Sequence, residues 1–258
     1  MTAPMVSTYS MWSLFRNCRK AVDWRYLQQL VPLERDRNLH FGSLIHECLQ
    51  AWHQRRDLAE VLALIDRLCS NRLQDENQSR DWHLATAMMR AYAARYAADD
   101  FEVIALEKNF EGPVVNPATG AASRSFLLAG KVDGIVRIGA EYFILEHKTA
   151  AQVDGDYLEK LWTDFQITIY AHYIEQTMGM PITGVLYNVL VKAKLQQGKG
   201  ETEDEFQARR VELLAKSKTG KSTAKRRMPE TDDEFQQRLG EKYADPAMFH
   251  REMLYLSR

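Results

Sequence analysis

Asp133, Glu146 and Lys148 are the side chains whose types and spacing point most directly to chemistry. Two carboxylates beside an open position suit Mg²⁺ or Mn²⁺, hard cations that prefer oxygen ligands and retain several waters. Such an ion can polarise a phosphodiester oxygen and activate a bound water, and an adjacent lysine can orient that water or offset charge in the transition state. Spacing alone favours a plainer interpretation, in which the three residues are solvated at an exposed strand end.

Two strands are expected to position these side chains. Residues 131–138 and the aromatic, β-branched run 142–148 predict a hairpin joined by a glycine turn. Side chains alternate along a strand, so Glu146 and Lys148 are expected to point the same way, roughly 6 to 7 Å apart. A closed hairpin brings Asp133 beside Glu146, and the three charged groups then converge on one patch.

Four motifs, taken in order, resemble the active-site motifs of the PD-(D/E)XK nuclease superfamily and, most closely, of its RecB-like branch. They are FGSLIHECL with Gly42 and His46, GKVDG with Asp133, ILEHKT with Glu146 and Lys148, and DFQITIY with Gln166 and Tyr170. The resemblance spans about residues 10 to 195, and its order is more specific than any single motif. It implies a restriction-endonuclease-like α/β core, a central mixed β-sheet flanked by helices, with an N-terminal helical subdomain.

The resemblance also implies roles for individual residues. Asp133 and Glu146 would bind a metal ion through their side chains, His46 through its imidazole and His147 through its backbone carbonyl. Lys148 would be the catalytic lysine.

Three further residues receive supporting roles. By the resemblance, Gln166 and Tyr170 would lie at the margin of the site and contact DNA or position Lys148. The spacing of the two is equally compatible with an ordinary amphipathic helix margin. Glu107, in an expected strand at 103–112, would support the metal or a lysine, or is a partly exposed strand glutamate.

The function implied by the resemblance is a Mg²⁺- or Mn²⁺-dependent DNA nuclease, a hydrolase of phosphodiester bonds. It leans toward an exonuclease acting in DNA recombination, repair or phage DNA processing. Two other classes stay open, a DNA-binding module that does not cleave and a nuclease subunit that depends on a helicase or recombination partner. A homo-oligomer is compatible with each of them.

The three cysteines decide whether an iron–sulfur cluster is expected. Iron–sulfur members of the RecB-like branch, AddB-type and CRISPR-associated nucleases, carry one cysteine near the position of Cys18 and three near the C-terminus. No cysteine follows Cys69. No iron–sulfur cluster is therefore expected, and Cys18 is expected to be a buried small hydrophobe.

Composition sets the bounds of the molecule. The chain has 258 residues, of which 45% are hydrophobic, enough for one substantial core with an appended subdomain. A formal net charge of −1 argues against coating by nucleic acid over the whole surface. There is no apolar run near the roughly 18 residues of a membrane span, and no signal-peptide pattern. We expect a soluble protein in the cytoplasm of a bacterial or phage-infected cell, with no membrane partner.

The chain divides into three expected parts. Residues 1–100 form a helical region that packs on the core and contributes His46, residues 101–195 form the catalytic core, and residues 196–258 hold a basic loop, short helices and a C-terminal strand. The interleaved aromatic and basic residues of 7–30 suggest either a nucleic-acid surface or a helix docked to the body, and docking is favoured.

Other expected helices cover 41–53, 58–72, 82–98 and 157–178, and a strand buried on both faces covers 183–191. For the long helix, the expected buried stripe is Leu158, Trp162, Phe165, Ile169 and Tyr173.

The region after residue 192 is rich in lysine and arginine. In KSKTGKSTAKRR, residues 216–227, six of twelve residues are basic. This mobile loop would contact DNA phosphates, or it is a solvated insertion with no partner. The basic residues concerned are Lys218, Lys221, Lys225, Arg226 and Arg227. GKST is not a nucleotide-binding loop, because Ala215 stands where such a loop needs glycine. A ten-residue repeat at 201–210 and 230–239 predicts two acid-capped helices.

Overall fold

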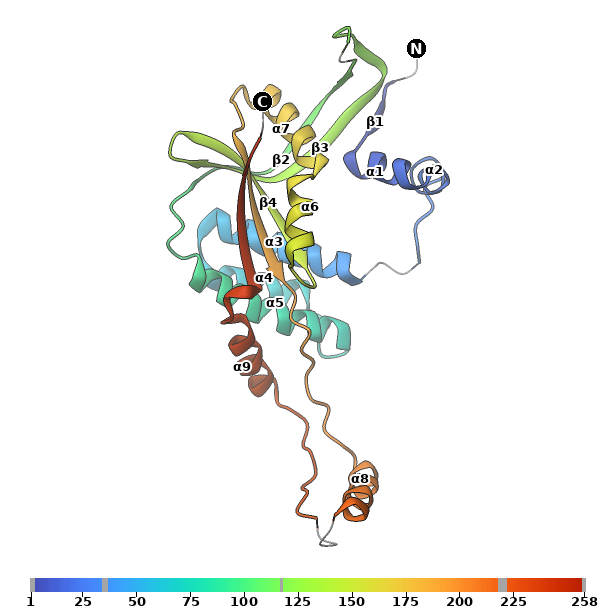
Figure 1. Cartoon of the computed structure of the whole chain (residues 1–258), viewed down its shortest axis with the longest axis vertical. Coiled ribbons are helices and arrows are strands. Elements are labelled where there is room, and N and C mark those ends of the chain that lie inside the picture. Colours follow the sequence, from blue (N-terminus) through green and yellow to red (C-terminus); the bar gives the residue numbers. More distant parts are fainter. Residues whose placement is uncertain (1–2, 34–36, 117, 218–221, 257–258) are drawn as a thin grey trace.

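The computed structural model describes residues 3–33, 37–116, 118–217 and 222–256. Within them the chain forms a six-stranded mixed sheet with helices on both faces (Figure 1), which confirms the predicted α/β class. The strand order is β1-β3-β4-β5-β6, with β2 paired to β3. The strands are β1 (Met5–Ser7), β2 (Glu102–Val115), β3 (Ala122–Ile138), β4 (Glu141–Ala150), β5 (Gly184–Val191) and β6 (Phe249–Tyr255).

β3 is the strand that the others flank. β2 pairs with almost the whole of one edge of β3, in antiparallel register. On the other edge, β1 pairs with residues 126–128 in parallel, and β4 pairs with residues 134–138 in antiparallel. Among the described residues, no strand therefore pairs with residues 129–133 on that edge. This short gap in the sheet contains Asp133.

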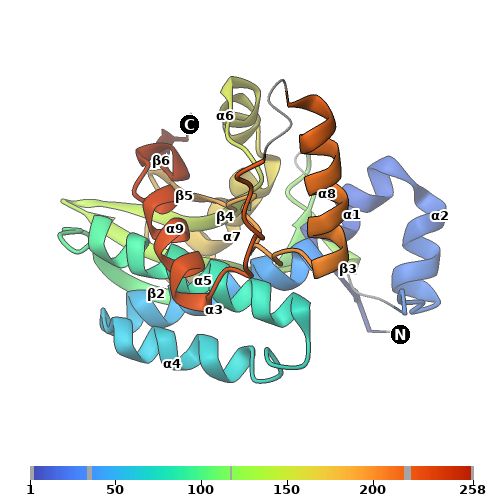
Figure 2. The same cartoon turned by 90° about the horizontal axis from the view of Figure 1, so that it is seen from below.

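Two layers of helices enclose the sheet (Figures 1 and 2). One face carries α3 (Arg37–Arg55), α4 (Leu58–Leu68) and α5 (Glu76–Arg95), and the other carries α6 (Gly155–Trp162) and α7 (Phe165–Met178). All eight residues of β5 are buried between the layers, as its continuous apolar sequence predicts. The apolar stripe of α3 is buried as its spacing predicts, and it comprises Phe41, Leu44, Ile45, Cys48, Leu49 and Trp52.

The prediction of one helix over 157–178 is wrong. The chain breaks between α6 and α7, where the side chain of Asp164 caps α7 by accepting a hydrogen bond from the amide of Gln166 at 3.0 Å. The break changes which side chains face the core. Trp162 and Phe165, expected to be buried, are 71% and 53% exposed. The buried positions are Leu161, Ile167, Tyr170, Ala171, Tyr173 and Ile174.

The N-terminal segment contacts the body less than expected. After β1 come α1 (Tyr9–Asn17), α2 (Arg19–Val22) and a π-helix (Asp23–Leu27). Trp12 packs on the core that includes α7, but Phe15, Trp24 and Leu27 are 48%, 49% and 62% exposed. The favoured interpretation, a docked aromatic stripe, is therefore wrong for these three side chains.

The cysteines differ in their surroundings. Cys18 is exposed between α1 and α2, so the expectation that it is buried is wrong. The physical reason is the same shallow contact of this segment with the sheet. Cys48 and Cys69 are buried, and burial raises the pKa of their thiols to about 12 and about 11, which keeps them in the unreactive thiol form.

An arm leaves the body after β5 (Figure 1). It carries α8 (Glu203–Lys216) at its far end and returns to α9 (Asp232–Tyr243), which packs on α5. α8 ends at Lys216, the first residue of the basic segment 216–227. After α9 a 3₁₀ turn (Pro246–Met248) leads into β6, which confirms the predicted C-terminal strand.

The ten-residue repeat forms two equivalent helix starts. α8 and α9 each begin with a capping box, Thr202 with Glu205 and Thr231 with Glu234. The predicted acid-capped helices are thus present, and the repeat also explains how the arm is held closed.

The first repeat holds the returning chain. The amide of Glu201 donates to the carbonyl of Arg227 at 3.1 Å, and its carboxylate accepts from the amide of Arg227 at 2.8 Å. Arg209 binds that carboxylate at 2.9 Å and donates to the carbonyl of Lys225 at 2.9 Å.

The second repeat does the same to the outgoing chain. Glu230 exchanges two hydrogen bonds of 2.8 Å with Gly198, and Arg238 binds Glu230 and donates to the carbonyl of Gln196 at 2.8 Å. The two halves match in register. Arg227, the partner of Glu201, lies three residues before Glu230, and Gly198, the partner of Glu230, lies three residues before Glu201. The carbonyls bound by the two arginines, those of Lys225 and Gln196, lie five residues before Glu230 and Glu201. This pseudo-twofold unit is called the clasp below.

None of the helices within the described residues combines the length and hydropathy that crossing a bilayer requires.

Candidate active site

The site lies where β3 and β4 separate. Their pairing ends at Gly134 and Leu145, whereas β4 continues beside β5 as far as Ala150. Continuing the register places Asp133 level with Glu146 at the mouth of the gap. The sheet itself therefore brings together the two carboxylates that the hairpin predicts.

Asp133 is held by two neighbours. One carboxylate oxygen accepts a hydrogen bond from the amide of His147 at 2.8 Å, and the other lies 3.2 Å from Nδ1 of His46 on α3. Burial favours the neutral acid, but the hydrogen bond and charge of His46 outweigh it and lower the pKa of Asp133. Burial lowers the pKa of His46, but Asp133 more than compensates, so that pKa is raised.

Glu146 and Lys148 point the same way, as strand alternation predicts. The ammonium Nζ lies 2.6 Å from Oε1 of Glu146. Glu146 is only 5% exposed, and this burial raises its pKa to about 7 although Lys148 opposes the shift. Burial acts to lower the pKa of Lys148, but the carboxylate of Glu146 reverses the effect and raises it. The lysine is therefore a retained positive charge.

Asp164 is a site residue that the sequence interpretation missed. Its carboxylate, at the break between α6 and α7, lies 3.9 Å from Nζ of Lys148 and accepts a hydrogen bond from the hydroxyl of Tyr187 at 3.2 Å. A helix-capping aspartate before Gln166 was the available signal, but the apolar spacing on both sides of it predicts an unbroken helix.

Gln166 and Tyr170 lie one turn apart on α7. Burial and the charge of Glu146 raise the pKa of the Tyr170 phenol, while the side chain of Gln166 and the charge of Lys148 act to lower it. Tyr170 is buried, with its ring 4.9 Å from that of Phe110. The structure therefore places both residues beside the carboxylate–lysine pair, with Tyr170 also serving the core.

Glu107 lies opposite Asp133 in the β2–β3 register, between the pairs formed by Leu106 and Lys108. Its φ is 50°, a left-handed conformation that is uncommon for a side chain other than glycine. Its carboxylate forms an ion pair with Lys131. The structure thus gives Glu107 a lysine contact.

A buried polar network supports the backbone behind the site. Nδ1 of His147 accepts a hydrogen bond from the Asn188 amide at 3.0 Å, and the same amide donates to the Tyr92 hydroxyl at 2.9 Å. That hydroxyl lies 3.2 Å from Nε2 of His53 and accepts from Arg251 at 3.2 Å. Three strands and two helices are thereby joined behind the strand that carries Glu146. An asparagine inside the apolar run of β5 was the sequence signal for this network.

The basic residues of the arm that the structure describes do not join these groups. Arg226 forms an ion pair with Glu203 at 3.4 Å, and Arg227 bonds to Glu201 within the clasp. Lys225 contributes its carbonyl to the clasp. Lys218 and Lys221 lie outside the described residues.

The donor chemistry fits a divalent cation. Asp133 and Glu146 supply hard oxygen ligands at one opening, His46 supplies a nitrogen, and the buried Glu146 carboxylate is the type of group that a cation would stabilise in its charged form. Among the described residues, no three acidic, histidine or cysteine side chains converge tightly enough to form a complete metal site. The carboxylate of Glu146 instead turns to Lys148, and that of Asp133 to His46.

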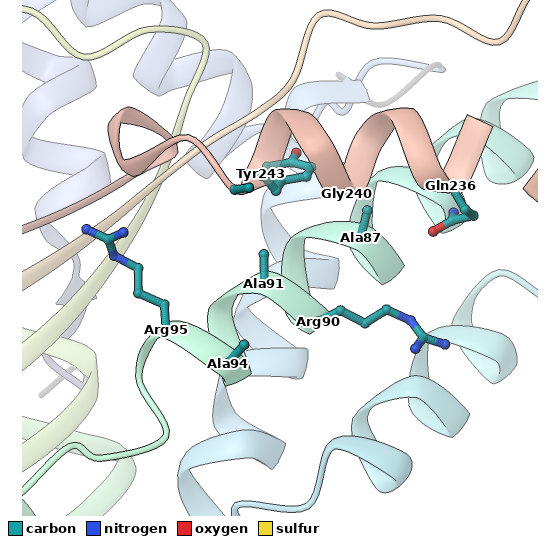
Figure 3. Close-up of a pocket in the computed structure, with 9 residues that line it drawn as sticks. Ala87, Arg90, Ala91, Ala94, Arg95, Gln236, Gly240 and Tyr243 are labelled. Carbon is teal, nitrogen blue, oxygen red and sulfur yellow. The ribbon is translucent and has the colours of Figure 1, made fainter. Parts of the chain in front are cut away.

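A separate pocket of about 580 Å³ lies between α5 and α9 (Figure 3). Small side chains line it, among them Ala87, Ala91 and Ala94, with Arg90 and Arg95 at its sides. No residue of the site described above lines this pocket, which is a gap in helix packing.

The part of the chain that contains these residues matches a known protein family. The family model for the PD-(D/E)XK nuclease superfamily matches residues 7–245, a span that includes every residue of the site. No curated protein matches the chain. Because the family match covers most of the chain and the fold is the expected mixed sheet between helices, the chain belongs to the PD-(D/E)XK nuclease superfamily, whose members generally use divalent metal ions.

Proposed function

We propose that this protein is a metal-dependent deoxyribonuclease of the RecB-like branch that degrades DNA from its ends. The observation that carries the proposal is the arrangement of Asp133, Glu146 and Lys148 at the gap between β3 and β4. The order of the four motifs supports the branch. In keeping with the motifs, its process is DNA recombination, repair or phage DNA processing in the cytoplasm.

Three side chains and one carbonyl would hold the metal ion. They are the carboxylates of Asp133 and Glu146, the imidazole of His46 and the backbone carbonyl of His147. When bound, Mg²⁺ or Mn²⁺ polarises the phosphodiester and lowers the pKa of water.

The remaining steps belong to the chain itself. Lys148 keeps its proton beside Glu146 and Asp164, so its charge offsets the negative charge that builds on the phosphate oxygens and helps to orient the attacking water. Gln166 and Tyr170, one turn apart on α7 at the margin, would fix the position of the lysine or contact the DNA strand.

An exposed surface near the N-terminus supports a DNA substrate. Arg19 lies over the ring of Phe15 at 5.3 Å and Lys20 over that of Trp24 at 5.6 Å. Exposed rings with adjacent cations are the surfaces on which single-stranded bases stack.

The test is a cleavage assay on linear double-stranded, linear single-stranded and closed circular DNA, with Mg²⁺, Mn²⁺ or EDTA. Wild type is compared with Lys148→Ala and with Lys160→Ala, a matched control because Lys160 is an exposed lysine on the neighbouring α6. We expect metal-dependent loss of linear DNA only, abolished in Lys148→Ala and unchanged in Lys160→Ala. Equal activity in the three proteins would exclude the role given to Lys148, and cleavage of circles would exclude dependence on ends.

A second candidate is a nuclease subunit that works only with a partner. It is favoured by apolar side chains on the arm, Val211 and Met228, which are 65% and 67% exposed. DNA binding without metal-dependent cleavage by wild type would support this candidate, or a binding module that does not cleave, over the proposal above.

A further inference from the structure

A pocket of about 440 Å³ lies just beyond the ends of β4 and β5, next to the first turn of α3. Four of its lining residues are cations that come from four parts of the fold. Arg37 begins α3, Arg80 lies on α5, Lys192 follows β5 directly, and Lys194 starts the arm.

The positive charge in this pocket is largely unbalanced. No ion pair joins Arg37, Arg80 or Lys194 to a carboxylate within the described residues, and Asp81 is the acid that faces Lys192, at 3.7 Å. Burial, together with the neighbouring Arg80 and Arg37, lowers the pKa of Lys192 although Asp81 opposes the shift. Four cations against one nearby carboxylate attract an anion.

Arg80 contributes a guanidinium to the lining of the pocket. Its Nε is buried and has no hydrogen-bond partner among the described residues. Phosphate oxygens are among the acceptors that best match the planar fork of a guanidinium. Arg37 adds the amino-terminal end of a 19-residue helix, where phosphates are also favoured.

The pocket lies on a path that leads from the candidate active site. Ala151, which lines it, follows Lys148 by three residues, or about 10 Å along an extended chain. α3 runs between the same two places, since its first residue, Arg37, lines the pocket and His46 lies against Asp133. Each DNA strand carries a phosphate about every 3.4 Å of helix axis, so a DNA strand in the candidate active site would carry other phosphates within about 10 Å of the cut.

We propose that this pocket binds a phosphate of the DNA strand being cut and thereby fixes the strand in the active site. The inference rests on the proposed function for the identity of the polymer. Two sources share this chemistry, an internal phosphodiester and the 5′-phosphate at a DNA end.

The test is DNA binding without catalysis. Fluorescence anisotropy in EDTA compares wild type with Arg80→Gln, Lys194→Gln and Arg67→Gln on labelled oligonucleotides over a range of KCl concentrations. Lys194 is exposed, so its replacement preserves folding, and Arg67 on α4 is an exposed matched control outside the pocket. Thermal unfolding verifies the fold of each variant.

We expect Arg80→Gln and Lys194→Gln each to weaken binding about tenfold and to reduce the salt slope by about 1, and Arg67→Gln to change neither. Persistence of the effect on 5′-hydroxyl and circular single-stranded DNA identifies an internal phosphate. Disappearance of the effect on those two substrates identifies a terminal 5′-phosphate.

The pocket and the proposed function fail in different ways. If wild type cuts DNA but both folded pocket variants bind with wild-type affinity and salt slope, the pocket proposal is overturned and the nuclease stands. If wild type binds DNA through the pocket but lacks metal-dependent cleavage, the pocket stands and the proposal that this chain cleaves DNA by itself is overturned. Absence of DNA binding by wild type overturns the pocket as a DNA phosphate site.

Discussion

The carboxylate of Asp164 serves three groups at once. It accepts from the amide of Gln166 at the start of α7 and from the hydroxyl of Tyr187 on β5, and it lies 3.9 Å from the ammonium of Lys148. A helix cap and a lysine-positioning group are thus one side chain, so the break between α6 and α7 and the chemistry of the site depend on the same residue.

This double role gives the first prediction. Asp164→Ala and Asp154→Ala each remove a helix cap, and both are expected to lose about 1 kcal/mol of unfolding free energy in urea titrations. Only Asp164 approaches Lys148, because Asp154 caps α6 through Tyr157 in an exposed position. The cleavage assay should therefore show a loss of roughly tenfold or more for Asp164→Ala alone. Equal activities in the two variants would limit Asp164 to capping.

His53 is a buried residue whose protonation opposes folding. Burial and the neighbouring His147, Arg56 and Arg251 lower its pKa to about 2, against 6.5 in a solvated chain. Between these values the unfolded chain binds the proton and the folded protein does not, so stability falls as the pH falls below 6.5.

The second prediction isolates this effect. The unfolding free energy of wild type minus that of His53→Gln is expected to decrease by about 1.4 kcal/mol for each pH unit between 6.5 and about 4. Denaturant titrations at fixed ionic strength measure the difference. A difference that stays constant over this range would mean that His53 can be protonated in the folded protein.

At the residue scale, the sequence predicts what depends on neighbours along the chain. Strand alternation and the hairpin bring Glu146 to Lys148 and Asp133 to Glu146. The sequence does not predict contacts that only tertiary packing creates. Asn188 stands out as polar in an apolar strand, but its partners His147 and Tyr92 are 41 and 96 residues away.

At the scale of elements, β5 and β6 approach closely at Gly184. A Cβ at this position would stand 2.1 Å from the carbonyl oxygen of Leu254, a backbone atom that cannot move aside alone. β6 closes the sheet beside β5, and Arg251 on β6 reaches the network behind the site. Glycine is therefore the residue that fits this close approach of β5 and β6.

The third prediction follows from this contact. Gly184→Ala is expected to lower the unfolding free energy by about 1–3 kcal/mol, as overpacking does. Gly155→Ala is the control, since no atom lies within 4 Å of its Cβ position and it stands in the first turn of α6, where alanine is at least as favourable. Thermal unfolding compares the two. A stable Gly184→Ala protein would show that β6 can shift along β5.

Element boundaries show where periodicity fails as a guide. The stripe of α3 was predictable because one uninterrupted helix keeps one phase. At 157–178, a two-residue break rotates the second helix relative to the first, so the expected stripe points to solvent at Trp162 and Phe165. β1 escaped prediction because three residues carry no periodicity and depend on β3 for pairing.

At the scale of the whole molecule, the proposed metal site would couple metal binding to folding through Glu146. Its pKa of about 7, raised by burial, means that the metal-free folded protein holds this proton more tightly than the unfolded chain does. The stability that the folded protein gains from holding this proton is fully present below pH 4.5 and is lost as the pH rises through 7. A cation at the site would remove this penalty, because it stabilises the carboxylate.

The fourth prediction is a pH-dependent gain in stability with Mg²⁺. At saturating Mg²⁺ the melting temperature is expected to rise at pH 8, by up to the equivalent of about 2.7 kcal/mol at one hundred times Kd, and to rise much less at pH 6. Calorimetry measures the shift. Glu146→Gln is expected to abolish it, and Glu159→Gln, an exposed change on α6, to retain it. An equal rise at both pH values would argue against Glu146 as a ligand.

The clasp has a consequence for the changes of length that this chain can accept. Its two halves bind each other, and the outgoing and returning chains are joined at the base of the arm by Gly198 and Glu230. The chain between Gly198 and Glu230 therefore begins and ends at one place. The separation of β5 and α9 then does not depend on the length of the arm beyond this pair. Residues can therefore be added, removed or replaced at the tip of the arm, near α8, without altering the sheet. The duplicated decapeptide makes the arm a replaceable cassette on a fixed catalytic body.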